Sequence, residues 1–363
     1  MPLTYDAADS LFRQDKLNEL VADADGRRFL KLRSLSRTEY LKRLFHRAKI
    51  AIPNIGSRHL FGAAFSARIS TPMIEDCARD IYREERAQRK ANENELVNQL
   101  YRVQEFNWGG LHQNSLEKTI VDSYVKKITD YETLCRCVEN ELLVRMRGYV
   151  VCSWYNHWTS ILIEDIFKGH ANVLPAVGLI KKIDWFVHDV PFDLKVTYLP
   201  EGYIKVKRHV AGLRPELTLL RRVSRTHHLP IPADLADAAL LQDLWAKVAN
   251  HPSAECRQTI DGFVKFRDGL VNGIEKDPSE LIRWLYENQG ERRFDASNRL
   301  FLVLVDQRNY FDSWKLKRAK SLMEENIGRY LNTCGNHPGR RIKFDWKGVR
   351  YSTVSDVLVV RQT

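Results

Sequence analysis

The sequence predicts an α/β (α+β) protein with a helical front half and a β-sheet in its back half. Apolar residues recur at three- and four-residue spacing through most of residues 1–150, which is the periodicity of amphipathic helices. After residue 150 the pattern changes to short segments rich in β-branched and aromatic residues. Residues 300–305 form a continuous apolar run of strand length, which is typical of a buried central strand.

The expected helices of the front half follow one another with short breaks. Apolar periodicity places them at residues 6–22, 38–51, 72–106, 115–128 and 131–149. The third of these helices carries many positive charges among interspersed acids: Arg79, Arg83, Arg86, Arg89 and Lys90. Such a row of charges describes either a solvated helix face or a face that contacts phosphate groups. Residues 1–150 are therefore expected to form a helical region that binds DNA or a protein partner.

The back half alternates between helix and strand patterns. An apolar helix covers residues 154–168 and ends at Gly169. Strand patterns then follow at residues 172–177, 182–187, 192–198 and 203–209. A mostly helical stretch, the strand at 300–305, a helix at 314–331 and a hairpin of 341–346 with 349–360 complete the chain. Residues 151–363 are thus predicted to form one domain with a helical insertion at about 213–297.

The charge balance favours a polyanionic partner. Lys and Arg total 57 while Asp and Glu total 46, which gives a formal net charge of +11. An excess of this kind suits nucleic acid or an anionic surface. No apolar run reaches the length of about 18 residues that a transmembrane helix needs, and residues 1–28 lack the apolar core of a signal peptide. We therefore expect a cytoplasmic protein without a membrane partner.

Cysteine and histidine positions give no sign of a zinc site. Of the six cysteines only Cys135 and Cys137 are close in sequence, and they lack the second pair that a four-ligand site needs. His227 and His228 lie in a basic cluster without the acidic partners that would favour a metal site. The expected state is therefore a set of reduced, mostly buried thiols.

Three polar residues share one face of the third expected strand. Because strand side chains alternate, Asp193, Lys195 and Thr197 project together, while the opposite face is apolar. If residues 188–189 form a two-residue hairpin turn, paired positions sum to 377. Asp184 then lies opposite Asp193, with Cβ atoms about 4.5–5.5 Å apart. Two facing carboxylates repel one another unless a divalent cation lies between them.

A second register remains open. If residues 188–191 form a four-residue turn, paired positions sum to 379 and Asp184 faces Lys195 in an ordinary cross-strand ion pair. Pro191 is compatible with this longer turn. Both registers leave Asp184, Asp193 and Lys195 on one face of the hairpin.

These residues resemble the PD-(D/E)xK, or restriction-endonuclease-like, nuclease superfamily. Asp184 matches the first acid of that motif, although Ile183 stands where the motif has proline. Asp193, Leu194 and Lys195 match its second half. The short spacing between the two halves fits a tight hairpin.

The resemblance implies an α-β-β-β-α-β core with a glutamate on its first helix. It covers residues 154–198 well and residues 300–331 loosely. For the helix acid we select Glu164, because a charge in an otherwise apolar stretch is costly without a partner. The alternatives that remain open are Asp165, Glu139 and Glu141.

The resemblance implies a metal-dependent endonuclease that hydrolyses DNA phosphodiester bonds in bacterial restriction or anti-phage defence. Asp184, Asp193, Glu164 and the carbonyl of Leu194 would hold Mg²⁺, for which Mn²⁺ can substitute. Lys195 would orient the attacking water and stabilise the transition state. Double-strand cleavage would fit a homodimer, or a protein partner in a defence complex.

Polar and basic residues around this motif are candidates for contacts with DNA. They are Asn156, His157, Lys181, Lys182, Thr197, Lys205, Lys207 and Arg208. The alternative function is a non-catalytic nucleic-acid-binding or assembly protein on the same fold, in which Asp184 and Lys195 form a structural ion pair. A further alternative is a helical adaptor whose basic surface binds a protein.

Overall fold

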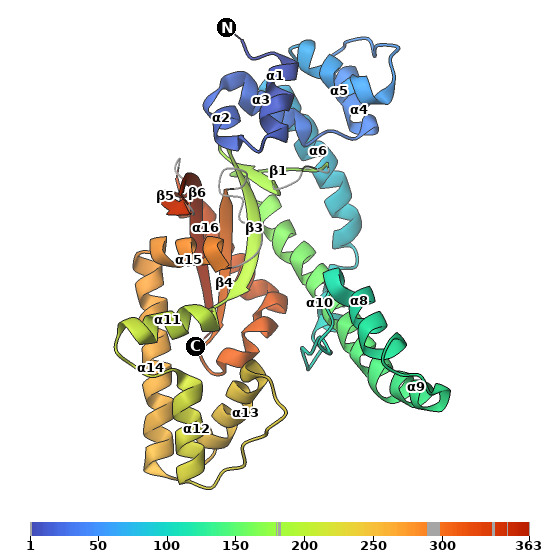
Figure 1. Cartoon of the computed structure of the whole chain (residues 1–363). Coiled ribbons are helices and arrows are strands. Elements are labelled where there is room, and N and C mark those ends of the chain that lie inside the picture. The colour runs from blue at the N-terminus through green and yellow to red at the C-terminus, as the bar shows by residue number, and fades with distance from the viewer. Residues whose placement is uncertain are drawn as a thin grey trace.

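Six strands form one mixed sheet in the part of the chain that the structure describes (Figure 1). The computed structural model describes residues 2–178, 180, 183–288, 298–335, 338–346 and 348–362. The strands are β1 (Val173–Pro175), β2 (Trp185–Val187), β3 (Val190–Tyr198), β4 (Arg299–Asp306), β5 (Arg340–Trp346) and β6 (Val349–Gln362). Their order across the sheet is β1-β2-β3-β4-β6-β5. The expected mixed α/β architecture is therefore confirmed.

Strand direction changes across the sheet. β1, β2 and β3 form an antiparallel meander, whereas β3, β4 and β6 run parallel to one another. β5 pairs antiparallel with β6 in the hairpin that the sequence predicted, and Gly348 in its turn has a φ of 77°. β4 lies between two parallel neighbours and is buried along almost its whole length, as its unbroken apolar pattern indicated.

Helices cover both faces of the sheet (Figure 1). On one face, α10 (Leu143–Lys168) and α16 (Lys320–Thr333) pack on the even-numbered apolar residues of β4. On the other face, α11 (Glu201–Val210), α14 (Ala254–Lys276) and α15 (Ser279–Asn288) pack on the odd-numbered ones. The alternation of one strand thus supplies two cores.

The first helices of the chain share a core with the edge of the sheet. They are α1 (Tyr5–Arg13), α2 (Leu17–Ala22), α3 (Ala24–Arg33), α4 (Thr38–Arg47), α5 (Ser57–Ser66) and α6 (Thr71–Lys90). The next helix, α7 (Glu93–Leu100), packs in another core, with Tyr155 of α10 and Trp314. Leu174, Ile183 and Phe186, from β1, β2 and the segment between them, belong to the core of α1 to α6. Buried Lys31 on α3 also forms an ion pair with Asp189 in the turn between β2 and β3. The N-terminal helices therefore support the hairpin that carries the motif.

A helical arm leads into α10 and extends away from the sheet (Figure 1, green). It consists of η1 (Gln113–Ser115), α8 (Leu116–Ile120), η2 (Val121–Val125), α9 (Tyr131–Cys137) and η3 (Val138–Leu142). Because α10 begins at Leu143, the expected boundary at residue 150 falls inside one helix. The end of this helix is as expected, with Gly169 as its C-cap.

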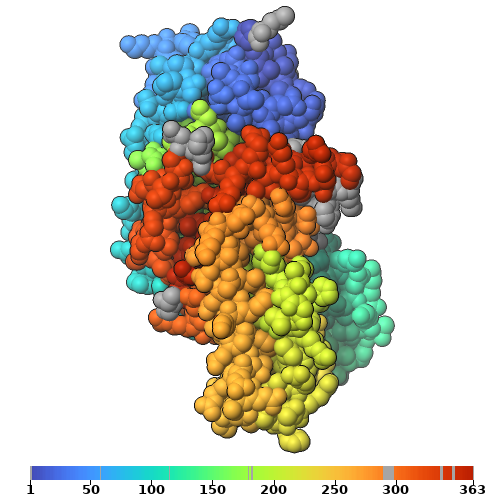
Figure 2. Space-filling model, turned by 90° about the vertical axis from the view of Figure 1, so that its left-hand side faces the viewer, coloured from blue at the N-terminus to red at the C-terminus, as the bar shows by residue number. Residues whose placement is uncertain are grey.

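The mostly helical stretch that the sequence predicted after residue 213, here called the insertion, contains α12 (Glu216–Thr226), α13 (Asp237–Ala249), α14 and α15. In Figure 2 the insertion (yellow-green to orange) projects below the β5–β6 hairpin (red). The strand expected at residues 203–209 is wrong, because this segment is α11. Its alternation of apolar and lysine residues imitates a strand, but Val206 is exposed, while Tyr203, Ile204 and Arg208 share the buried side of the helix.

The helix expected at residues 314–331 is two elements. η4 (Tyr310–Arg318) is a 3₁₀ segment, and α16 begins after Ala319. Among the described residues no helix is both long enough and apolar enough to cross a bilayer.

Candidate active site

The turn between β2 and β3 has two residues, which settles the register of the hairpin. Val187 pairs with Val190 and Trp185 pairs with Phe192, so paired positions sum to 377. His188, the first residue of the turn, has a φ of 52°, which is the left-handed conformation that two-residue hairpin turns require. The alternative register, with Asp184 facing Lys195, is therefore wrong.

Asp184 immediately precedes the first residue of β2 and is fixed to β3 through its carboxylate. Its backbone N–H donates to the carbonyl of Phe192 at 2.8 Å. Its Oδ2 accepts a hydrogen bond from the N–H of Leu194 at 2.7 Å. The Asp184 side chain thus accepts the hydrogen bond that the backbone of a longer β2 would accept from β3. It lies beside Asp193.

Asp184 is the electrostatically perturbed member of the predicted motif. Burial, together with the negative charges of Glu164 and Asp193, raises the pKa of its carboxyl from 3.8 to about 6. The hydrogen bond from the Leu194 N–H and the charge of Lys168 oppose this rise in pKa. Glu164 and Asp193 are therefore close enough to act on the Asp184 charge.

The helix acid near this group is Glu164 of α10. Its carboxylate binds Lys168, one turn later, at 2.8 Å. Asp165 points to a different partner, because its buried carboxylate accepts two hydrogen bonds from Arg89 of α6. Glu141 binds Tyr124 in the arm, about 35 Å along the helix from Glu164. Of the acids that we considered, Glu164 is therefore the one that the structure brings to Asp184.

Two positive groups contact Asp193. Lys195, which follows it on the same face of β3, donates from Nζ at 2.9 Å. The Nε of Arg299, at the start of β4, lies 3.5 Å from Asp193 Oδ2. Arg299 is buried, with its guanidinium over the ring of Tyr286, whereas the Lys195 side chain is 47% exposed. Arg299 therefore neutralises Asp193 from the protein side, and Lys195 can reach solvent or a substrate.

Sequence reasoning missed Arg299 and its neighbour Asn298. The signal was present, because two polar residues stand directly before the apolar run of β4. Parallel pairing places Arg299 beside Asp193, and the carbonyl of Asn298 accepts from the Asp193 N–H at 2.9 Å. The Asn298 side chain donates to the carbonyl of Pro191 and accepts from the N–H of Val354. It therefore joins β3 to β6 at the site.

Several predicted DNA contacts lie at the other end of β3. Thr197 is about 13 Å along the strand from Asp193. Asn156, about 12 Å along α10 from Glu164, accepts a hydrogen bond from Lys317 at 2.7 Å, and His157 is exposed beside it. The structure therefore does not bring these residues to the acid cluster.

The basic residues after β3 have unequal roles. Lys205 is exposed on α11, and Lys207 forms an ion pair with Glu280. Arg208 as a DNA contact is wrong, because its guanidinium is buried, lies over the rings of Phe263 and Phe266 and donates to a backbone carbonyl. Lys181 and Lys182 lie outside the described residues.

A basic groove of about 800 Å³ lies between α6 and the end of α10. Its lining includes the basic residues Arg79, Arg83, Arg86, Lys90, Lys168 and His170, together with the acids Asp165 and Glu324. Some of these charges have structural partners, since Arg86 binds Glu93 and Arg79 donates to the carbonyl of Val173. Lys168 belongs both to this groove and to the ion pair with Glu164, so the groove adjoins the acid cluster.

Comparison with known proteins gave no match to a family model, to a curated protein or to a solved structure.

Proposed function

We propose that this protein is a metal-dependent endonuclease whose active site comprises Glu164, Asp184, Asp193 and Lys195. The observation that carries the proposal is the position of Asp184. Its carboxylate is buried at the open end of the β2–β3 hairpin, where it accepts a hydrogen bond from Leu194. The negative charges of Glu164 and Asp193 act on it there. Groups that repel one another in this way are typical of sites that hold a divalent cation.

The chemistry of these donors would suit Mg²⁺, with Mn²⁺ as a substitute. Carboxylate oxygens of Asp184, Asp193 and Glu164, together with the carbonyl of Leu194, are hard ligands of the kind that Mg²⁺ prefers. A bound cation would supply an activated water and neutralise charge on a phosphodiester. Burial first, and then the charges of Glu164 and Asp193, raise the pKa of the Asp184 carboxyl, and a cation beside it would offset this penalty.

The residues of the chain have distinct tasks in this proposal. Lys195 is exposed enough to contact a phosphate, and its ammonium would orient the attacking water and stabilise negative charge in the transition state. Arg299 holds the Asp193 carboxylate from the buried side. Glu164 is restrained by Lys168, which also borders the basic groove.

The order of elements and the groove support DNA as the substrate. The chain runs α10, β1, β2, β3, a set of helices and β4, which is the order expected from the resemblance to the PD-(D/E)xK superfamily. A groove lined by arginine and lysine beside the acids suits a phosphate backbone. A role in bacterial restriction or anti-phage defence rests on that resemblance alone.

Plasmid cleavage with Mg²⁺ or Mn²⁺ tests the proposal. We expect Asp193→Ala and Lys195→Ala to lower the cleavage rate by at least about 100-fold, the scale of a lost acid–base or electrostatic group. Glu139→Gln is the matched control, because this acid is exposed on the distant arm and should leave the rate unchanged.

Equal cleavage by all four proteins would exclude this site. If the protein cleaves only a particular DNA sequence, a plasmid without that sequence stays intact, and a direct measurement of Mn²⁺ binding then tests the site. We expect Asp184→Asn together with Asp193→Asn to abolish the binding that the wild-type protein shows, and undiminished binding by that double variant would also contradict the proposal.

A further inference from the structure

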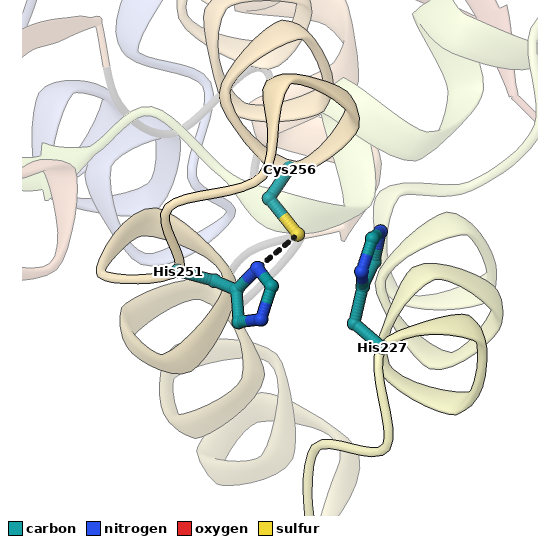
Figure 3. A group of neighbouring side chains, drawn as sticks. All are labelled: His227, His251 and Cys256. Carbon is teal, nitrogen blue, oxygen red and sulfur yellow. Dashed lines mark hydrogen bonds between the residues drawn. The ribbon is translucent and has the colours of Figure 1, made fainter.

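Three metal-ligating side chains meet in the helical insertion (Figure 3). His227 is the C-cap of α12, His251 lies between α13 and α14, and Cys256 lies in the first turn of α14. One ligand atom of each residue lies within 4.8 Å of those of the other two. Figure 3 shows the sulfur of Cys256 between the two imidazole rings, whose centroids are 4.8 Å apart.

The spacing of these atoms approaches that of a tetrahedral zinc site. His251 Nδ1 lies 3.4 Å from Cys256 Sγ. Bond lengths of about 2.0–2.1 Å for Zn–N and about 2.3 Å for Zn–S place a nitrogen and a sulfur ligand about 3.5 Å apart on a tetrahedron. Two imidazoles and a thiolate are ligands that select zinc over magnesium or calcium.

The surroundings are those of a closed structural site. Cys256 is fully buried and belongs to the core in which α12, α13 and α14 meet. The His227 side chain is 20% exposed. An ion at this place would join the end of α12 to the start of α14, and so fasten the helices of the insertion to one another.

Glu255 offers a further donor beside His227. Its Oε2 lies 3.0 Å from Nε2 of His227, and its side chain is 48% exposed, so the carboxylate has room to turn toward an ion. His227 therefore has an acidic partner, and the expectation that both it and His228 lack one is wrong for His227. The partner comes from the first turn of α14, which no local pattern reveals.

We propose that His227, His251 and Cys256 bind Zn²⁺ as a structural site, with Glu255 as the fourth ligand. Besides the ion pair of His227 with Glu255 and the contact of His251 with Cys256, the nitrogen atoms that would bind the ion have long polar contacts to Ser253. The Ser253 N–H lies 3.3 Å from His251 Nδ1, and the Ser253 Oγ lies 3.4 Å from His227 Nε2. Coordination would replace these contacts, since Ser253 also has the N-terminus of α14 to cap.

Cobalt(II) is the probe for this site, because a thiolate bound to Co²⁺ gives a charge-transfer absorption that oxygen ligands do not give. We expect the full chain, stripped of metal by a chelator, to develop this absorption on addition of Co²⁺ and to lose it when Zn²⁺ is added. Cys256→Ser should remove the band. His227→Ala and His251→Ala should weaken Zn²⁺ binding by at least about 100-fold, more than the loss of an outer-shell partner.

His228→Ala is the matched control, because this histidine is the exposed neighbour of His227 and should leave Zn²⁺ affinity unchanged. Glu255→Gln should weaken binding less than loss of Cys256. Wild-type protein without the thiolate band would overturn the proposal, whether or not any variant folds. A Cys256→Ser protein that binds Zn²⁺ with wild-type affinity would do the same. The double variant Asp184→Asn, Asp193→Asn should keep the band, which separates this site from the acid cluster.

Discussion

At the scale of single residues, the ionised carboxylate of Asp184 destabilises the folded protein. Burial and two neighbouring acids raise its pKa from 3.8 to about 6. Between these two values the folded protein holds a proton that the unfolded chain has released. The free energy of unfolding therefore falls as pH rises through this window, and the full penalty is present above about pH 6.

This penalty predicts that Asp184→Asn stabilises the metal-free protein. At pH 7.5 we expect the free energy of unfolding to rise by about 1–3 kcal/mol, since each pKa unit corresponds to about 1.4 kcal/mol. At about pH 3 the gain should nearly vanish, because this carboxyl is then protonated in both the folded and the unfolded protein. Urea unfolding in a chelator at both pH values measures the effect. Asp122→Asn is the control, because Asp122 forms only an exposed ion pair with Lys126 on the arm, and it should change the free energy of unfolding little at either pH. A lower free energy of unfolding for Asp184→Asn would contradict the proposed environment of this carboxyl.

At the scale of elements, the hairpin was predictable because its pattern is local. Alternation in β3 and the two residues between Val187 and Val190 determine which side chains share a face, and the structure has that register. The prediction for α11 failed because four alternating residues fit a strand and a helix equally well. The sequence marks Arg299 as a polar residue before an apolar run, but its position beside Asp193 could not be predicted. The parallel register of β3 and β4 depends on the packing of the helices between them rather than on neighbouring residues.

The junction of β3, β4 and β6 should depend on Asn298. Its buried side chain hydrogen bonds to the carbonyl of Pro191 and to the N–H of Val354, and Asn298→Ala leaves both groups without this partner. We expect a loss of about 2–3 kcal/mol in the free energy of unfolding, the usual cost of buried groups that lose their hydrogen bonds. Denaturant unfolding measures it. Asn272→Ala, which removes an exposed hydrogen bond to Arg361, is the control, and equal effects of the two substitutions would mean that Asn298 does not fasten this junction.

At the scale of the whole molecule, composition and periodicity predicted a helical front and a sheet-bearing back but not how they combine. The N-terminal helices share a core with β1 and β2, and α10 passes through the boundary that we expected at residue 150. The sequence alone does not decide whether the charged face of α6 contacts solvent or phosphate groups. The residues that surround this face come from α10 and from the region around β1, which are distant in the sequence. Only the assembled fold places that face beside Lys168, the ion-pair partner of Glu164.

On the proposed function, we expect the DNA backbone to bind in the groove between α6 and α10. Arg83 and Lys90 line it and are exposed. Reversal of both charges, Arg83→Glu with Lys90→Glu, should weaken binding to duplexes of any sequence. It should also reduce the slope of log affinity against log salt by about 1 for each phosphate that the protein no longer neutralises. Fluorescence anisotropy over a series of salt concentrations measures both quantities.

The control for the groove is Lys276→Glu at the end of α14, on the opposite face of the sheet. It changes the net charge of the protein without touching the groove, and it should alter affinity only slightly. If Lys276→Glu and a single groove substitution, Lys90→Glu, weakened binding equally, the overall charge of +11 rather than the groove would account for DNA affinity. Cleavage by the groove variants at saturating DNA should stay near the wild-type rate, because their side chains bind the backbone at a distance from Lys195. A matching loss of rate at saturation would instead place the groove within the catalytic machinery.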